Sequence, residues 1–390
     1  MINKFKTEEL GIGFDFDVEF EENQKVNCII GKNGIGKTQL LENIAKSLIY
    51  THSIFSNEDD YLYSKKYIQK DINEKIKDFG FNLPLSITLN NFQIKDINKK
   101  QHKWGYIKFD QVNMNREKGF ICDKPIVFIG AKNRGFTKNI NPDNIKILGS
   151  TQDRFVESIK RTMSYINGDG LEYEEIANWF VARLIVNPYF VRNEQNKTNE
   201  VVTVLKLIDK LEPNLNLVTD TGLKVIFDNG KLLINGIPID KLSTGFVSIV
   251  KIFQEIIAGY GGWSNLEDLN LVDGVVFIDE IEAHLHISWQ TKIINILKDF
   301  FPNTTFYITT HSPLVLAGLK DGEAYELYKE ENFVKSKAIT NVDNYALNDI
   351  VNEFFGVDLN REKVDNPNKE KQKKARALLL NLTKSLDGDE

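Results

Sequence analysis

Residues 31–38 have the types and spacing needed to bind phosphate groups. They read GKNGIGKT, a complete G-x-x-x-x-G-K-T phosphate loop between an apolar run at 26–30 and a helical pattern that begins at Gln39. The glycines of such a loop let backbone N–H groups curl around phosphates, the lysine adds positive charge, and the threonine hydroxyl joins Mg2+. The N-terminus of the following helix also faces the anion. The alternative, a glycine turn that opens an ordinary helix, leaves the complete motif unexplained.

Two adjacent acids end a second apolar run. Residues 275–278 read VVFI, and Asp279 and Glu280 follow directly. In a parallel sheet, active groups gather at the carboxyl ends of the strands, so both carboxylates should face the bound nucleotide. Asp279 suits Mg2+ binding, and Glu280 could accept a proton from an attacking water. The alternative is a helix cap or a pair of surface acids.

Two shorter motifs could complete a nucleotide site. The sequence LSTG at 242–245 precedes a helical pattern, so the Ser243 hydroxyl, the Gly245 N–H and the helix dipole would form a second anion site. In isolation this pattern is more typical of an ordinary helix cap. His311 follows an apolar strand pattern at 305–310, where it could hydrogen-bond a γ-phosphate or be only a turn histidine. The order of the motifs favours the nucleotide-binding interpretation of both.

The four motifs GKNGIGKT, LSTG, VVFIDE and TTHSP occur in an order that resembles ATP-binding-cassette ATPases of the SMC and repair type. The stretch DEIEAHLH at 279–286, followed by Gln290, is similar to compact AAA-like ATPases of bacterial anti-phage systems. These include the ATPase subunit of Septu, retron-associated ATPases, and the head of the overcoming-lysogenization-defect nucleases. Specific motifs carry the resemblance over about residues 1–50 and 220–320.

The resemblance implies a role for each motif residue. Lys37 would bind the β- and γ-phosphates, Glu280 the hydrolytic water and His311 the γ-phosphate, whereas Thr38 and Asp279 would hold Mg2+. The residues implied to contact ATP are Gly31, Asn33, Gly34, Ile35, Gly36, Lys37, Thr38 and Gln39 from one subunit, with Ser243 and Gly245 acting in trans from another. The family's metal-contacting glutamine has no clear counterpart after the phosphate-loop helix.

Each motif occurs once in the chain, so the implied assembly is a homodimer that sandwiches ATP at two composite sites, or a higher oligomer built from it. The implied function is an ATPase that controls a separate effector, a nuclease or retron component, in anti-phage defence. A nuclease domain within the chain is not expected, because only residues 314–390 follow the head.

Other functions remain open at this point. A nucleic-acid-handling ATPase of repair or recombination would need a basic surface that binds nucleic acid. The sequence contains one candidate, a Lys-rich stretch with interleaved aromatic residues, which could equally be a solvated loop. Its residues are Lys95, Lys99, Lys100, His102, Lys103, Trp104, Tyr106 and Lys108. A second basic candidate contains Lys132, Arg134 and Lys138, and this loop could equally approach the nucleotide. The Asp-Glu-x-Glu-Ala-His context speaks against a transporter cassette. His284, His286 and His311 suggest zinc only weakly, because no further ligand has convincing spacing.

The composition is that of an ordinary globular protein. The chain has 390 residues, 42% of them hydrophobic and 27% charged, with a formal net charge of -6. This negative net charge argues against a protein whose whole surface is basic and binds nucleic acid. Cys28 and Cys122 provide no disulfide framework, there is no signal-peptide core, and no run approaches the about 20 apolar residues of a membrane span. We therefore expect a cytoplasmic protein that has no membrane partner.

Alternating helix and strand patterns predict an α/β fold: an ABC-type P-loop NTPase head, with a parallel core sheet, an antiparallel β layer and an inserted, largely helical lobe. We expect an N-terminal lobe at 1–53, an insertion at 54–215 whose strand at 125–130 belongs to the head, a C-terminal lobe at 216–325, and a hairpin with helices at 326–390 that could dock a partner. Within these ranges, Asn229-Gly230 predicts a tight hairpin and residues 288–300 predict one helix.

Overall fold

The computed structural model describes residues 2–52, 80–82, 86–94, 106–108, 122–132, 134–137, 148–166, 175–184, 197–263, 268–340, 342 and 347–355. The chain divides into two compact units, Met1–Asn344 and Tyr345–Glu390; helix α10 (Leu347–Phe355) belongs to the second unit. Residues 53–79 of the predicted insertion, residues 356–390 of the predicted C-terminal segment, and the side chains of the Lys-rich stretch at 95–108 lie outside what the structure describes. The four-part domain division therefore stays a prediction.

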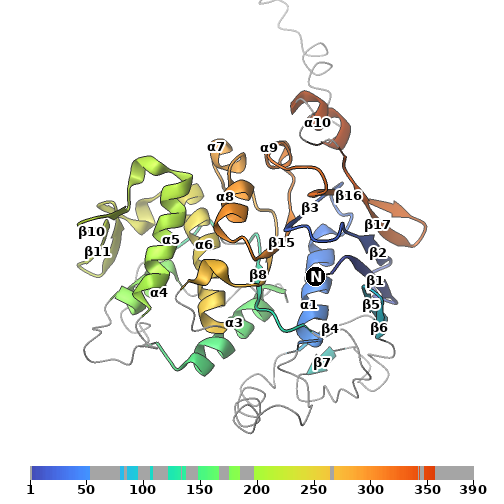
Figure 1. Cartoon of the computed structure of the whole chain (residues 1–390), viewed down its shortest axis with the longest axis horizontal. Helices are drawn as coiled ribbons and strands as arrows, with labels where there is room; N and C mark the ends of the chain where they lie inside the picture. Colours follow the sequence, from blue (N-terminus) through green and yellow to red (C-terminus); the bar gives the residue numbers. More distant parts are fainter. Residues whose placement is uncertain are drawn as a thin grey trace, which may run out of the picture. The chain divides into compact units, whose positions relative to one another are not determined.

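Within the described residues of the first unit, ten strands form one sheet (Figure 1). Their order is β6 (Phe92–Ile94), β5 (Ser86–Leu89), β1 (Lys4–Glu8), β2 (Asp15–Glu19), β17 (Phe333–Ala338), β16 (Ala324–Glu330), β3 (Val26–Ile30), β15 (Thr305–Thr309), β14 (Val275–Ile278) and β8 (Ile126–Ile129). Neighbours from β16 to β8 are parallel, whereas β6, β5, β1 and β2 pair antiparallel. The predicted fold class is confirmed, and the parallel core and antiparallel layer are continuous with each other.

The burial of each strand follows from its sequence. Strands β3, β8, β14 and β15 are buried at every position, which is expected of parallel strands covered on both faces. Strand β2 instead alternates, with Phe16 and Val18 buried between more exposed acids, as its period-two pattern predicts. The parallel strands therefore form the centre of the core, and the antiparallel strands extend it outward.

Helices cover both faces of the parallel strands. On one face, α1 (Lys37–Tyr50) and α3 (Thr151–Ile166) contribute to the same apolar cluster as Ile126 and Phe128 of β8. On the other, Gly259 of α6 (Thr244–Trp263) lies so close to Val127 that a Cβ on the glycine would be 2.4 Å from a methyl group. Helix α5 (Thr198–Leu211) contacts α6, α4 (Ile176–Leu184) and α8 (Ile293–Phe300), and Figure 1 shows α3, α4, α5 and α6 together.

Short elements complete the described chain. Strands β4 (Gly80–Asn82) and β7 (Tyr106–Lys108) pair, as do β9 (Val218–Thr219) and β10 (Gly222–Leu223). A three-stranded sheet contains β11 (Val225–Asp228), β12 (Lys231–Ile234) and β13 (Ile237–Pro238). Its predicted hairpin is confirmed: Asn229 and Gly230 have φ of 47° and 75°, which match the positive values of a tight turn. Among the described residues, no helix has the length and apolar character that crossing a bilayer requires.

One predicted helix is interrupted. The helical pattern at 288–300 forms α7 (Ile287–Gln290) and α8, with a turn at Thr291 and Lys292, so the prediction of a single helix is wrong. The Thr291 hydroxyl donates to the Ser288 carbonyl at 3.1 Å, and the Lys292 N–H donates to the Trp289 carbonyl at 3.0 Å. These shorter-range bonds replace the regular α-helical pattern at the break.

Candidate functional site

The loop at 31–38 connects β3 to α1 in a conformation that requires glycine. Gly31, Gly34 and Gly36 have φ of 146°, 78° and 103°, values that residues other than glycine rarely adopt. Space is also restricted, because a Cβ on Gly36 would lie 2.9 Å from the Phe14 ring. The spacing of the glycines in the sequence thus corresponds to the positions where the backbone curls.

Lys37, the first residue of α1, is a buried cation held by backbone carbonyls. Its Nζ donates to the carbonyls of Gly31 and Lys32 at 2.8 and 3.2 Å. Burial lowers the pKa of Lys37, and the negative charges of Glu280 and Asp279 act in the opposite direction. Among the described residues, no carboxylate forms an ion pair with this ammonium. A bound anion would therefore compensate a charge that the fold leaves without an ion pair.

The hydroxyl of Thr38 meets the carboxylate of Asp279, although the two residues are far apart in sequence. Thr38 Oγ1 donates toward the two carboxylate oxygens, at 3.1 and 3.0 Å. Thr309 Oγ1 donates to Asp279 Oδ1 at 2.6 Å. The meeting follows from topology, because β3, β15 and β14 are parallel neighbours and their carboxyl ends lie at one edge. A hydroxyl and a carboxylate held together are the hard oxygen donors that suit Mg2+.

Glu280 has an unusual backbone conformation for a residue with a side chain. Its φ is 45°, in the left-handed region, and its N–H donates to Thr309 Oγ1 at 2.8 Å. The guanidinium of the fully buried Arg134 donates to the carbonyls of both Asp279 and Glu280. The two acids are thus held by their backbone, and their carboxylates remain at the pocket.

A pocket of about 510 Å3 brings most predicted site residues together. It is lined by Asn33, Gly34, Gly36, Lys37, Thr38, Gln39, Asp279, Glu280, Thr309 and His311. Gly31 and Ile35 are not in this lining, but the Gly31 carbonyl accepts the Lys37 bond. Thr309 was not predicted; its signal in the sequence was a hydroxyl at the end of an apolar strand.

The His311 segment is held by a third acid of the motif. Glu282 accepts from the His311 N–H and from the Thr310 hydroxyl, each at 2.6 Å. Beside it, the Ser312 hydroxyl donates to Gln290 Oε1 at 2.6 Å and also caps α9 (Pro313–Leu316). Glu282, in the loop after β14, and Gln290, at the end of α7 (Ile287–Gln290), thus both hold the segment that carries His311.

The motif at 242–245 lies outside this pocket lining. Ser243 is exposed, and its Oγ accepts the Phe246 N–H at 3.2 Å at the start of α6. Gly245 is buried: a Cβ there would lie 2.7 Å from the His284 carbonyl oxygen. Within one chain the motif therefore acts as a helix cap and a close contact, and its role toward a nucleotide stays a prediction.

Comparison with known proteins identifies related chains. The family model described as "AAA domain, putative AbiEii toxin, Type IV TA system" matches residues 26–317. Septu protein PtuA of Bacillus mycoides (strain KBAB4) is 26% identical over 81% of this chain and 38% of its own length. Septu protein PtuA of Bacillus thuringiensis is 24% identical over 90% of this chain and 83% of its own length. The chain thus spans well under half of the first protein and most of the second.

A retron protein and a solved structure are also similar. Retron Vc95 probable ATPase of Vibrio cholerae serotype O1 biovar El Tor is 24% identical over 77% of this chain and 68% of its own length. A crystal structure of an SMC head bound to the C-winged helix domain of ScpA covers 87% of this chain and 98% of its own, at 12% identity and a TM-score of 0.39. The predicted resemblance to Septu and retron ATPases is confirmed.

Proposed function

Because the chain belongs to the AAA-domain family whose model it matches, we propose that it is a Mg2+-dependent ATPase that binds and hydrolyses ATP. The observation that carries the proposal is the contact between Thr38 and Asp279 at 3.0 Å, beside the buried ammonium of Lys37, in one pocket. These groups supply the charge and the oxygen ligands that a nucleotide with its metal requires.

Each residue of the pocket has a distinct part in the proposed reaction. The Lys37 ammonium exchanges its carbonyl partners at Gly31 and Lys32 for phosphate oxygens. Thr38 and Asp279 hold Mg2+, which when bound neutralises charge on the phosphates. Glu280 orients the attacking water and accepts its proton, and His311 contacts the γ-phosphate. The curled backbone at 31–36 points N–H groups at the phosphates.

We propose further that the active assembly is a homodimer. Ser243 and Thr244 are exposed and do not line the pocket of their own chain. In a two-fold pair, the start of α6 of one copy would face the phosphate loop of the other, which gives two equivalent sites. ATP bound between the copies then stabilises the dimer, and hydrolysis releases it.

We propose that the protein acts in the cytoplasm in anti-phage defence, and the names of the relatives support the defence role. Two are named Septu protein PtuA and one a retron probable ATPase. By analogy, we propose that the ATPase regulates a separate effector, a nuclease or retron component. Affinity purification from the native host is expected to recover that effector, and deletion of the gene is expected to change phage sensitivity. Recovery of no partner together with unaltered sensitivity contradicts the defence role.

The catalytic proposal is tested with Glu280→Gln, which keeps the side-chain size and removes the proton acceptor. We expect phosphate release from Mg-ATP to fall by a factor of about 100 to 10,000, whereas binding of the fluorescent analogue mant-ATP persists. Sedimentation with ATP is expected to show a trapped dimer. Glu157→Gln, on the exposed side of α3, is the matched control and should behave as wild type. Wild-type turnover by Glu280→Gln excludes Glu280 as the base, and a monomer with ATP bound contradicts the dimer.

A further inference from the structure

Arg134 is a fully buried arginine that contacts the two acids through their backbone. It lies in the turn after β8 and is 0% exposed. Nη1 donates to the Asp279 carbonyl at 2.7 Å, and Nη2 donates to the Glu280 carbonyl. It does not line the pocket, so direct contact with a nucleotide is not its role. Its fork instead spans two consecutive peptide groups.

Burying the Arg134 guanidinium has a desolvation cost that reduces the stability of the fold. Burial lowers the pKa of Arg134, while the negative charges of Asp279, Glu282 and Glu280 act in the opposite direction. Among the described residues no carboxylate forms an ion pair with the guanidinium, and its Nε has no hydrogen-bond partner. An apolar side chain would fill the same space without this desolvation cost.

The bonds of Arg134 act on the one residue of the pocket whose backbone is strained. The left-handed φ of 45° at Glu280 is unfavourable for a residue with a Cβ, and it persists only where neighbours hold it. Thr309 accepts the Glu280 N–H at 2.8 Å, and Arg134 donates to the Glu280 carbonyl. Both hydrogen-bonding groups of the residue are thereby fixed, and the direction of its side chain is fixed with them.

The turn that carries Arg134 also packs on His284, which lies farther along the loop after β14. A Cβ on Gly135 would lie 3.0 Å from the His284 ring, and the Phe136 and His284 rings are 6.2 Å apart in an edge-to-face arrangement. From the other side, the Ser248 hydroxyl of α6 donates to the Ala283 carbonyl at 3.0 Å. The loop after β14 is therefore enclosed between this turn and α6.

We infer that Arg134 is a positioning residue for hydrolysis: it holds the Asp279-Glu280 backbone so that Glu280 directs its carboxylate at the attacking water. The inference rests on the proposed ATPase function and extends it to a residue that never touches the nucleotide. Loss of the fork lets the strained peptide relax, which displaces the base while Lys37 and the phosphate loop remain in place. Displacement of a reacting group by about 1 Å reduces the rate by a factor of about 100.

The test compares Arg134→Met and Arg134→Lys with wild type. In the methionine variant we expect kcat to fall about 100-fold while KM and the Kd of mant-ATP change less than about threefold. The lysine variant keeps the charge, but its single ammonium has no fork that fits two carbonyls, so we expect it to recover only part of kcat.

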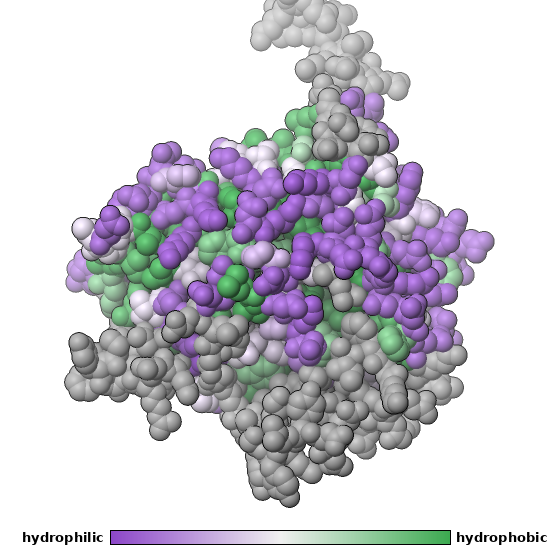
Figure 2. Space-filling model, in the orientation of Figure 1, coloured by the Kyte–Doolittle hydropathy of each residue, from purple (hydrophilic) through white to green (hydrophobic). Residues whose placement is uncertain are grey.

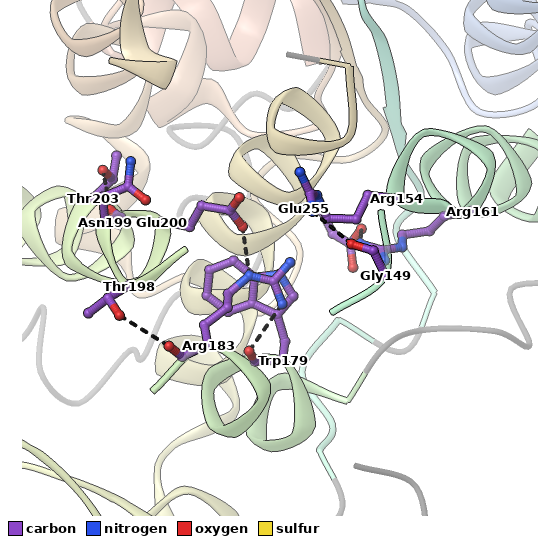
Figure 3. A network of polar contacts seen from close by, with 10 residues as sticks. All are labelled: Gly149, Arg154, Arg161, Trp179, Arg183, Thr198, Asn199, Glu200, Thr203 and Glu255. Atoms are coloured by element: carbon purple, nitrogen blue, oxygen red, sulfur yellow. Dashed lines mark hydrogen bonds and ion pairs between the residues drawn. The ribbon is translucent and has the colours of Figure 1, made fainter. Parts of the chain in front are cut away.

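The control is another arginine that joins two helices away from the pocket. Figure 3 shows Arg161 of α3 directed at Glu255 of α6. Arg161 Nη1 lies 3.3 Å from Glu255 Oε2, and Lys251 Nζ lies 3.0 Å from Glu255 Oε1. Arg161→Met should lower thermal stability and leave kcat per folded molecule unchanged. This separates a positioning effect from general destabilisation.

The outcomes distinguish the inference from the function on which it rests. Absence of ATPase activity in the wild-type protein overturns the proposed function and the inference with it. With active wild type, an Arg134→Met kcat within about threefold of normal overturns the inference alone, and so does a loss of mant-ATP affinity in step with kcat. If the methionine variant does not fold, the lysine variant decides: wild-type kcat overturns the inference, and a reduced kcat at unchanged affinity supports it.

Discussion

At the scale of single residues, Lys37 combines a cost to stability with a proposed role in binding. Its ammonium is buried against two carbonyls, and burial lowers its pKa below the ordinary value of 10.5. Between the lowered value and 10.5 the unfolded chain binds more protons than the folded chain. The free energy of unfolding therefore rises with pH across that window, and below it the cost of burying the charge is fully present.

Lys37→Met is therefore expected to abolish mant-ATP binding and yet to leave the nucleotide-free protein as stable as wild type or more stable at pH 7. The advantage should diminish as the pH is raised toward 10.5, because the wild-type lysine then loses its charge in the folded state and with it the cost of burying that charge. Thermal unfolding across this pH range measures the effect, with exposed Lys241→Met as the control. A clear loss of stability at pH 7 would show that the ammonium stabilises the empty loop.

At the scale of elements, the start of α6 packs closely against the loop that follows β14. Gly245 lies against the His284 carbonyl, and Ser248 bonds the Ala283 carbonyl at 3.0 Å. This contact links the 242–245 motif to the acids within one chain. A change at Gly245 therefore affects the chain that carries it, in addition to any effect on a second copy.

Gly245→Ala tests this contact, because the added methyl carbon would lie 2.7 Å from the His284 oxygen. We expect a loss of about 1–3 kcal/mol in the free energy of unfolding without nucleotide, where no dimer contact contributes. Urea unfolding measures it, and Thr244→Ala, at an exposed neighbouring position, is the control. An unchanged midpoint for Gly245→Ala would mean that the loop and the helix separate at little cost.

At the scale of the whole molecule, the chain contains one phosphate loop and one 242–245 motif, and only the first contributes to the pocket lining. This separation is what a composite site between two copies requires. The family match over residues 26–317 includes all four motifs and leaves out only strands β1 and β2 of the head's first strands, so it includes both proposed halves of such a site.

Complementation tests the composite site. Ser243→Arg and Lys37→Ala should each abolish ATPase activity, the first from the partner's side of a site and the second from the nucleotide side. Mixed in equal amounts, they are expected to recover about a quarter of wild-type activity, because half of the dimers are mixed and each has one intact site of two. No recovery at any mixing ratio contradicts the assignment of Ser243 in trans.

The sequence alone predicted the features that depend on neighbouring residues. The glycines at 31, 34 and 36 and the turn at Asn229 and Gly230 were predicted because each needs a local backbone conformation that few residues adopt. The apolar runs of β3 and β14 were predictable for the same reason, since burial on both faces leaves a continuous pattern. The order of the motifs then predicted the pocket.

Contacts between distant segments were decided by the tertiary structure. Thr309 bridges Asp279 and the Glu280 N–H only because β15 and β14 are parallel neighbours, and Arg134 reaches both acids only because β8 pairs with β14 on the other side. Thr309 opens the TTHSP motif, but its hydroxyl reaches the Asp279 carboxylate and the Glu280 N–H only through this strand pairing. Arg134 belongs to none of the four motifs, and it acts through backbone carbonyls that every residue possesses. The sequence by itself thus determined most of the residues that line the pocket, whereas strand order decided which other side chains hold them in place.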